Sequence, residues 1–164
     1  MKRVVIVRHA KSVPYGYEDD FNRDLRDRGV NDAKLVSQEL KKEGILPDIM
    51  ISSPALRAIK TARIFAENLG FNQKNIREME KIYHGLTSGE FLDVIRELPG
   101  DAEAVFFFGH NPDFQIFTGN LLENYTENMP TCATIGIDFN IEKWEFAEAR
   151  TGKMAFRLIP KMFK

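Results

Sequence analysis

The sequence predicts an α/β domain in which helices cover both faces of a mainly parallel central sheet, a three-layer α/β/α architecture. Two continuous apolar runs, Val4–Val7 and Ala104–Phe108, support this prediction because they do not alternate with polar residues. Such runs are typical of strands that are buried on both faces, as in parallel sheets. Predicted helices separate the strands along the chain, as the crossover connections between parallel strands require.

Length and composition indicate one soluble, enzyme-sized domain over residues 1–164. The chain has 23 basic and 24 acidic residues, a balance that gives no sign of a nucleic-acid or membrane partner. Its single cysteine, Cys132, excludes an internal disulfide and favours a reducing compartment. No apolar run is long enough to cross a bilayer, and no signal peptide precedes the first strand. We therefore expect a cytoplasmic protein.

The first half of the chain alternates strands with helices. After the first strand, a polar loop over 13–24 leads into a helix predicted over 27–43, where apolar residues recur at helical spacing. A short strand over 48–52 follows. Ser53-Pro54 then predicts a helix N-cap with proline at the first helical position, and this helix should extend to residue 69.

The second half continues the alternation and then changes character. It is predicted to hold a weak strand, a helix, the second apolar strand and another helix, over 76–79, 87–98, 104–108 and 113–122. Beyond them, apolar and polar residues alternate over 134–140 and 153–159. Alternation is typical of strands with one solvated face, so we expect an antiparallel pair at the edge of the sheet.

Basic and imidazole side chains follow three of the predicted strands. Arg8 and His9 end the first strand, Arg57 lies one turn into the helix after the second, and His110 follows the strand over 104–108. If the crossovers are right-handed, these residues meet at the carboxyl edge of the sheet, where open α/β folds bind ligands. Arginines bind phosphate through paired donors, and a neutral imidazole can attack phosphorus. Fixed cations would stabilise phosphoryl transfer without a metal.

Short motifs at these positions resemble the histidine phosphatase superfamily, whose fold is called phosphoglycerate mutase-like. The matching segments are Arg8-His9-Ala10 for its Arg-His-Gly signature, Ser52-Ser53-Pro54 with Arg57 and Thr61 for its Ser-Pro-x-x-Arg-x-x-x-Thr segment, and Gly109-His110-Asn111-Pro112 for the second-histidine segment of the SixA-like phosphohistidine phosphatases. Each motif is weak alone. Together they are specific, because each follows its own predicted strand and the resemblance covers nearly the whole chain.

The resemblance implies a role for each of the four basic residues. His9 would be the nucleophile that becomes transiently phosphorylated. Arg8, Arg57 and His110 would bind the phosphoryl group and stabilise the transition state. The resemblance implies neither a cofactor nor a metal ion.

Further positions carry weaker expectations from the same resemblance. Ser12 and Arg23 lie in a loop that borders the phosphate in relatives, and are candidates for substrate binding. Glu80, three residues before Tyr83, resembles the general acid of larger members, with Glu78 as a fallback. An exposed glutamate at a strand end is an equally open interpretation of Glu80.

The chain departs from the family pattern at two positions. Ala10 replaces the usual glycine, so the turn after His9 must tolerate a Cβ atom. Arg26 stands where relatives often have a capping threonine, and Asp27 is expected to take over that cap.

A zinc site is an alternative use of the histidines. His9, His84 and His110 could hold a catalytic zinc ion. The neighbouring arginines would repel a cation, and no pair of ligands has metal-binding spacing. The phosphate interpretation is therefore favoured, with His84 as a surface or supporting residue and Cys132 as a small buried hydrophobe.

Chain length bears on the substrate. Larger relatives insert a helical lid before the second-histidine strand, whereas residues 80–100 leave room for a turn and one helix. Without a lid subdomain, an open site would admit a phosphate displayed on another protein. We therefore expect a phosphatase for phosphohistidine in proteins, with a small-molecule phosphomonoesterase of the same mechanism and a non-catalytic phosphate-binding module as alternatives. The expected partner is a phosphorylated protein, such as one with a phosphohistidine domain, or a small phosphorylated molecule.

Overall fold

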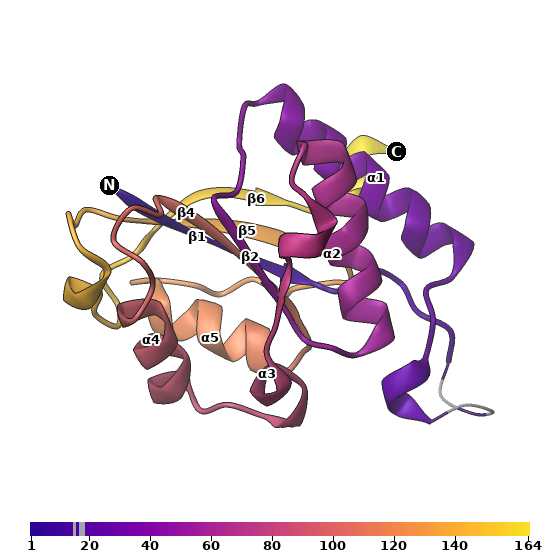
Figure 1. Cartoon of the computed structure of the whole chain (residues 1–164), viewed down its shortest axis with the longest axis horizontal. Coiled ribbons are helices and arrows are strands. Elements are labelled where there is room, and N and C mark those ends of the chain that lie inside the picture. The colour runs from indigo at the N-terminus through magenta and orange to yellow at the C-terminus, as the bar shows by residue number, and fades with distance from the viewer. Residues whose placement is uncertain (15, 17–18) are drawn as a thin grey trace.

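A computed structural model describes residues 1–14, 16 and 19–164, and in this part of the chain the strands form a six-stranded sheet (Figure 1). The strand order is β3-β2-β4-β1-β5-β6. The strands are β1 (Lys2–Arg8), β2 (Ile49–Ser52), β3 (Arg77–Glu78), β4 (Ala104–Gly109), β5 (Thr134–Phe139) and β6 (Lys153–Leu158). The first four are parallel, and β5 and β6 are antiparallel at one edge. The mainly parallel sheet and its antiparallel edge pair are thus confirmed.

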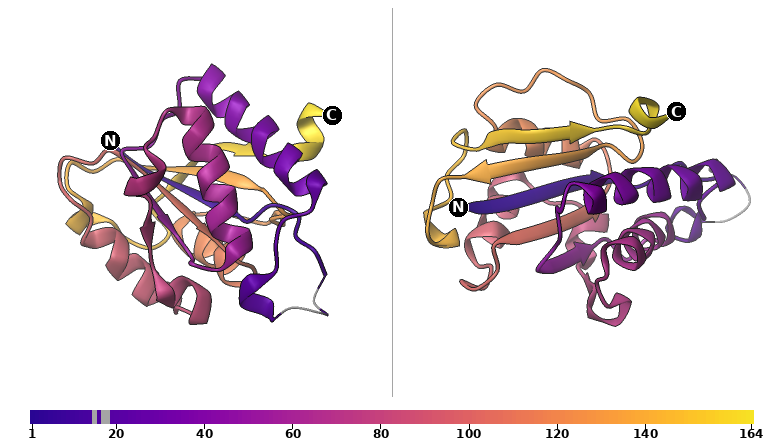
Figure 2. Two further views of the ribbon diagram at one scale, coloured as in Figure 1. Left: turned by 45° about the vertical axis from the view of Figure 1, so that its right-hand side comes forward. Right: turned by 90° about the horizontal axis from the view of Figure 1, so that it is seen from above.

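Helices lie on both sides of this sheet (Figure 2). The α-helices are α1 (Asp27–Lys42), α2 (Leu56–Leu69), α3 (Glu80–His84), α4 (Ser88–Arg96) and α5 (Asp113–Leu121). Short 3-10 turns are η1 (Asp20–Asn22), η2 (Gln73–Asn75), η3 (Trp144–Phe146) and η4 (Pro160–Phe163). Within the described ranges, no helix combines the length and the apolar character needed to cross a bilayer.

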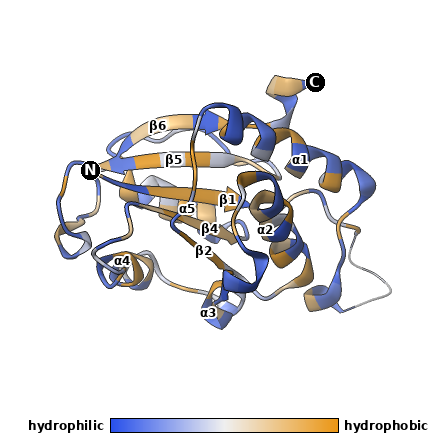
Figure 3. Cartoon of the chain, turned by 45° about the horizontal axis from the view of Figure 1, so that its top comes forward, coloured by the Kyte–Doolittle hydropathy of each residue, from blue (hydrophilic) through white to orange (hydrophobic). Residues whose placement is uncertain are grey.

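The apolar run of β1 supplies both halves of the core. Val4 and Ile6 belong to one buried cluster together with Phe91 of α4. The alternate residues Val5 and Val7 belong to the cluster on the opposite face, which includes side chains from α1 and α2. All four β1 side chains are fully buried, and burying a side chain of this size stabilises a fold by about 1.5–3 kcal/mol. This two-sided burial explains why the run does not alternate, and the strands stand out as apolar in Figure 3.

Two helix starts differ from the prediction. The first residue of α2 is Leu56, with Ala55 as its N-cap, so Ser53-Pro54 does not begin the helix. Ser53 instead accepts a hydrogen bond from the Ala55 N–H at 3.2 Å and turns its hydroxyl toward His110. The expectation that Asp27 caps α1 is wrong, because Asp27 is the first residue inside the helix.

The parallel pairing brings the ends of three strands to one edge. Arg8 at the end of β1 is in register with Gly109 at the end of β4, and Ser52 at the end of β2 is in register with Phe108. Past the strand ends, the N–H of His9 donates to the Gly109 carbonyl at 2.9 Å. The residues that follow these strands therefore lie at neighbouring positions.

Candidate active site

A pocket of about 310 Å³ opens at this edge of the sheet, and its lining is basic. Arg8, His9, Arg57 and His110 all line it, together with Ser12, Arg23, Lys11 and Arg26. The described residues that line the pocket include no carboxylate. A larger groove of about 490 Å³ lies beside it, shares Asn111 with it, and contains none of the four basic residues. The pocket is therefore suited to a small, highly charged anion.

The ring of His9 forms a hydrogen bond through Nδ1, and Nε2 takes no part in that bond. Its Nδ1 atom lies 2.8 Å from the Ala10 carbonyl oxygen, and since a carbonyl can only accept, Nδ1 carries the proton. Burial is the main cause that lowers the pKa of His9 to about 4; the charges of Arg57 and Arg8 act in the same direction, and the hydrogen bond to Ala10 opposes them. At neutral pH the ring is uncharged and Nε2 bears a lone pair, which is the state of a nucleophile.

His110 lies beside His9, with 5.4 Å between the ring centroids. Its Nε2 atom is 2.8 Å from the hydroxyl oxygen of Ser53, at the start of the segment that leads into α2. Burial is the main cause that lowers the pKa of His110 to about 3, and the charge of Arg57 acts in the same direction. His110 is therefore neutral, and a neutral imidazole can still donate a hydrogen bond to an anion.

The two arginines are anchored through their terminal nitrogens. Arg8 donates from Nη1 to the Met129 carbonyl at 3.0 Å, and Arg57 donates from Nη1 to the Asp20 carbonyl at 2.7 Å. Burial lowers the pKa of Arg8, but a guanidinium group keeps its charge at any physiological pH. Both Nε atoms are buried and have no hydrogen-bonding partner among the described residues. Two fixed charges thus face one pocket.

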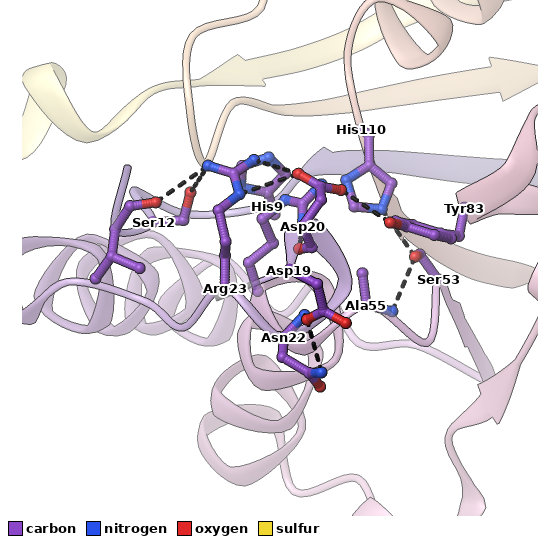
Figure 4. A network of polar contacts seen from close by, with 12 residues as sticks. His9, Ser12, Asp19, Asp20, Asn22, Arg23, Ser53, Ala55, Tyr83 and His110 are labelled. Atoms are coloured by element: carbon purple, nitrogen blue, oxygen red, sulfur yellow. Dashed lines mark hydrogen bonds and ion pairs between the residues drawn. The ribbon is translucent and has the colours of Figure 1, made fainter. Parts of the chain in front are cut away.

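The carboxylate of Asp20 contacts two of the basic residues at the site, and the sequence did not predict this residue there. Its Oδ2 atom accepts hydrogen bonds from Arg57 at 3.1 Å and from the Tyr83 hydroxyl at 2.9 Å, and its Oδ1 atom accepts from Arg23 at 3.0 Å (Figure 4). Burial raises the pKa of Asp20, but the bonds from Tyr83, Arg57 and Arg23 outweigh it, and the net shift is downward. The carboxylate is therefore ionised.

Ser12 and Arg23, the weaker candidates for substrate binding, are brought to the pocket. Arg23 Nη1 lies 3.5 Å from the Ser12 hydroxyl and donates to the Val13 carbonyl at 3.0 Å. The predicted loop over 13–24 places η1 next to α2 and supplies Arg23, while Ser12 lies directly before this loop. Positions 15, 17 and 18 of the loop lie outside the described residues.

Glu80, by contrast, is not brought to the pocket. It is the first residue of α3, its side chain is 71% exposed, and it lies 3.5 Å from His84 Nε2. Glu80 and His84 are four residues apart and share one face of α3, whereas Tyr83 points toward Asp20. Glu78, the fallback, is exposed on β3. His84 is exposed as well, and the described residues include no His, Cys, Asp and Glu group suited to a metal ion.

The backbone of Cys132 contacts the backbone of Arg8 and His9. It is fully buried, and its N–H is shared between the carbonyl oxygens of Arg8 at 3.1 Å and His9 at 3.0 Å. This bond fixes the backbone at the end of β1.

Comparisons with known proteins point to one superfamily. A model of the histidine phosphatase superfamily (branch 1) matches residues 4–129. The chain is 34% identical over 119 residues to phosphoserine phosphatase 1 from Hydrogenobacter thermophilus, in a match that covers 70% of this chain and 56% of that protein. This chain thus spans little more than half of that relative's length.

Solved structures share the fold over nearly the entire chain. The SixA protein from Agrobacterium tumefaciens superposes with a TM-score of 0.81 at 22% identity, covering 97% of this chain and 98% of its own. The protein histidine phosphatase SixA complexed with tungstate superposes with a TM-score of 0.79 at 19% identity, covering 99% of both chains. At these identities the similarity shows the fold, which is phosphoglycerate mutase-like.

Proposed function

The chain belongs to the histidine phosphatase superfamily, and we propose that it removes phosphoryl groups from phosphohistidine in proteins through a covalent intermediate on His9. The observation that carries this proposal is the state of His9. Its ring is neutral, Nδ1 is committed to the Ala10 carbonyl, and the side chain lines a pocket of fixed positive charge. A nucleophile and the means to stabilise an anionic transition state are thus in one place.

In the first step, Nε2 of His9 attacks phosphorus while the bond to the leaving nitrogen breaks. Arg8 and Arg57 bind the phosphoryl oxygens, and His110 adds a neutral donor. The ring of His9 becomes positively charged as the new bond forms, and the hydrogen bond from Nδ1 to Ala10 at 2.8 Å stabilises that charge. The guanidinium groups take the part that a metal ion has in other phosphatases, so we expect activity in the presence of EDTA.

Two observations support a protein substrate. The fold matches SixA proteins, one of them described as a protein histidine phosphatase, over nearly their whole length. In addition, α3 and α4 are the helices between β3 and β4, and α4 packs its Phe91 and Leu92 into the core. We therefore infer that the pocket is open enough to admit a phosphorylated side chain of another protein.

A small-molecule phosphomonoesterase is the second candidate. It is favoured by the 34% identity to phosphoserine phosphatase 1. Its leaving group is an alkoxide, which needs a proton more than an imidazole does. Turnover of a phosphohistidine-containing protein, phosphoramidate and phosphoserine should be compared under the same conditions. Preference for phosphoserine by more than an order of magnitude in kcat/KM would replace the first candidate by the second.

Trapping the intermediate tests the mechanism shared by both candidates. The wild-type protein is mixed with radiolabelled phosphoramidate and quenched in base, where phosphohistidine survives. We expect label on the wild type and on His84→Gln, whose histidine is exposed, but none on His9→Gln. Turnover without label on the wild type, or label on His9→Gln equal to that on the wild type, contradicts the mechanism.

The cellular location is also a proposal. The single cysteine favours a reducing compartment, and we propose the cytoplasm. Fractionation of cells that express the tagged chain tests this.

A further inference from the structure

The pocket carries more positive charge than a single phosphoryl group can balance. The cationic side chains that line it among the described residues are Arg8, Lys11, Arg23, Arg26 and Arg57. In the same part of the chain, Asp20 is the carboxylate that pairs with two of them, Arg23 and Arg57. A phosphoryl group brings a charge of about −2 at most. Positive charge therefore remains at the pocket after the phosphoryl group is bound.

Lys11 and Arg26 carry this remaining charge. Among the described residues, no ion pair includes either of them. The nearby Lys60 is different, because its Nζ atom lies 2.8 Å from the carboxylate of Asp24. Arg26 is the N-cap residue of α1, but its side chain makes no capping hydrogen bond to the helix. In this part of the chain, both charges are thus available to an anion that comes from solution.

The backbone holds Lys11 and Arg26 side by side. The N–H of Arg26 donates to the Lys11 carbonyl at 2.9 Å, and the next pair of residues, Ser12 and Leu25, forms an antiparallel bridge. Lys11 is half-buried and Arg26 is exposed, whereas His9 in the same pocket is buried. Lys11 and Arg26, here called the outer basic pair, therefore form the part of the pocket nearest to solvent.

The charge around the pocket is asymmetric. The adjoining groove of about 490 Å³ shares Asn111 with the pocket, and its described lining includes Glu127 but no lysine or arginine. Positive charge outside the proposed catalytic residues is thus concentrated on the segments that carry the outer basic pair. A negatively charged partner would approach the pocket from that side, because opposite charges steer association.

We propose that the outer basic pair binds carboxylates of the substrate protein that lie beside its phosphohistidine, so that the chain selects phosphohistidine in an acidic surrounding. This inference rests on the proposed function and specifies the kind of partner. Neighbouring Cα atoms are about 3.8 Å apart, so acidic side chains one or two positions from the phosphohistidine can reach the outer part of the same pocket. The pair would then recognise the partner while Arg8 and Arg57 bind the phosphoryl group.

The chemistry of the outer basic pair fits carboxylates. The guanidinium of Arg26 is a planar fork that matches the two oxygens of a carboxylate, and Lys11 adds a compact charge beside it. Residue 26 is also the position where relatives often have a capping threonine. In this chain the side chain of residue 26 does not cap the helix, and it lines the pocket instead. Arginine at this position therefore supplies a charge at the pocket in place of a helix cap.

Two synthetic peptides that differ only in flanking charge test the proposal. Each has one central histidine, which is phosphorylated with phosphoramidate before use. The two residues on either side of it are glutamates in one peptide and glutamines in the other. Release of inorganic phosphate, corrected for spontaneous hydrolysis, gives kcat/KM for each peptide. The ratio of the acidic to the neutral value is then compared between variants, because this ratio does not depend on the amount of folded protein.

The wild type should favour the acidic peptide by about three- to tenfold at low salt, as expected for a few exposed ion pairs. The ratio should fall toward one in about 0.5 M NaCl, because salt screens such pairs. In the double variant with Lys11→Gln and Arg26→Gln, the ratio at low salt should be less than half of the wild-type value. Arg26→Glu should lower it as well, because the new carboxylate repels the acidic peptide.

A double variant with Lys41→Gln and Lys42→Gln is the matched control. It removes the same charge from the exposed last turn of α1, whereas Arg26 precedes the first turn. At 1.5 Å of rise per residue, these positions are on the order of 20 Å apart. The control should keep the wild-type ratio, because its lysines lie far from the pocket.

Three results overturn the proposal. The first is a wild-type ratio below about threefold at low salt, which is too small for recognition by two charges. The second is a ratio in the variant of Lys11 and Arg26 that stays above half of the wild-type value. The third is an equal fall in the control, which would assign the preference to the net charge of the protein.

Failure of the proposed function has a different signature. If the wild type hydrolyses phosphoserine but neither peptide, a phosphohistidine protein is not its substrate, whatever the flanking charge. Hydrolysis of both peptides with equal kcat/KM leaves the proposed function in place and removes only the role of the outer basic pair.

Discussion

The backbone N–H of Ala10 donates a hydrogen bond to the hydroxyl of Thr61 at 3.0 Å, across 51 residues of sequence. The same hydroxyl donates to the carbonyl of Arg57 at 2.7 Å. One buried side chain therefore connects the turn that presents His9 to the helical turn that presents Arg57. The spacing of Arg57 and Thr61 on α2 has a structural reason: the arginine faces the pocket, and the threonine fixes the turn beside it.

Substitution Thr61→Val should cost both stability and activity. Valine fills the same volume but leaves the buried Ala10 N–H without an acceptor, which costs about 1–3 kcal/mol of unfolding free energy. The turn that orients His9 should also loosen, so kcat should fall. Urea unfolding and turnover of phosphoramidate measure the two effects.

Thr118→Val is the matched control for Thr61→Val. Thr118 is equally buried, but its hydroxyl donates to the Phe114 carbonyl within its own helix, so no backbone donor is left unpaired. It should lose less stability and keep the wild-type kcat. Equal losses in both variants would mean that the bond to Ala10 has no special role.

Gly29→Ala tests the close approach between α1 and the loop after β1. A Cβ atom at Gly29 would overlap the carbonyl oxygen of Lys11, a backbone atom that cannot rotate away. Overpacking of this kind costs about 1–3 kcal/mol, and it should also displace Ser12 at the pocket and weaken phosphate binding. Gly89→Ala on α4 is the control, because the nearest atom is 3.9 Å from the added methyl group. That variant should gain about 0.5–1 kcal/mol.

The two site histidines make stability depend on pH. Burial lowers the pKa of His9 to about 4 and of His110 to about 3, both below the ordinary value of 6.5 that the unfolded chain has. The unfolded state therefore binds more protons between pH 6.5 and about 4. The stabilisation that comes from the neutral histidines is fully present above pH 6.5. Below pH 6.5, the free energy of unfolding falls by up to about 1.4 kcal/mol per pH unit for each histidine.

The measurement is the unfolding free energy in urea at pH 7 and at pH 5. The double variant with His9→Gln and His110→Gln should lose less stability over this interval than the wild type. His84→Gln, which removes an exposed histidine, should keep the wild-type slope. An unchanged slope in the double variant would show that neither site histidine is held neutral by the fold.

Arg57→Lys tests the guanidinium geometry while keeping the charge. Arg57 is 5% exposed and donates from two nitrogens to Asp20, in the fork geometry that also binds phosphate oxygens. Lysine provides a single donor atom, so the inhibition constant of inorganic phosphate should rise by about tenfold or more. Arg63→Lys, an exposed position on the same helix, is the control. Inhibition constants that agree between the two variants would exclude paired recognition by Arg57.

The convergence of the four basic residues could be predicted from the sequence because it follows from strand order. Parallel strands end at one edge: Arg8 is the last residue of β1, His9 directly follows it, and His110 directly follows β4. Apolar runs identified β1 and β4 because burial on both faces removes alternation. The apolar runs are recognised from a periodicity among neighbouring residues. The meeting of the strand ends follows from the right-handed crossovers that connect successive parallel strands.

The missed residues depend on geometry that has no local pattern. Asp20 lies in a loop whose path is determined by contacts with Arg57 and Tyr83, from segments 37 and 63 residues away. Glu80 was expected at the site because it resembles the general acid of larger relatives. The five-residue helix α3, which was not predicted, directs Glu80 toward solvent. A short helix without an apolar face leaves no periodic signal, so the side of it that faces the pocket could not be foreseen.

The burial of Cys132 has a practical consequence. Burial raises the pKa of its thiol, and a protonated, enclosed sulfhydryl does not react with maleimides. Because the chain has no other cysteine, a single new one can carry a fluorophore without protecting the native residue. Asn22→Cys, at an exposed position of η1, would place such a reporter two residues from Asp20, where an emission change could follow substrate capture in real time.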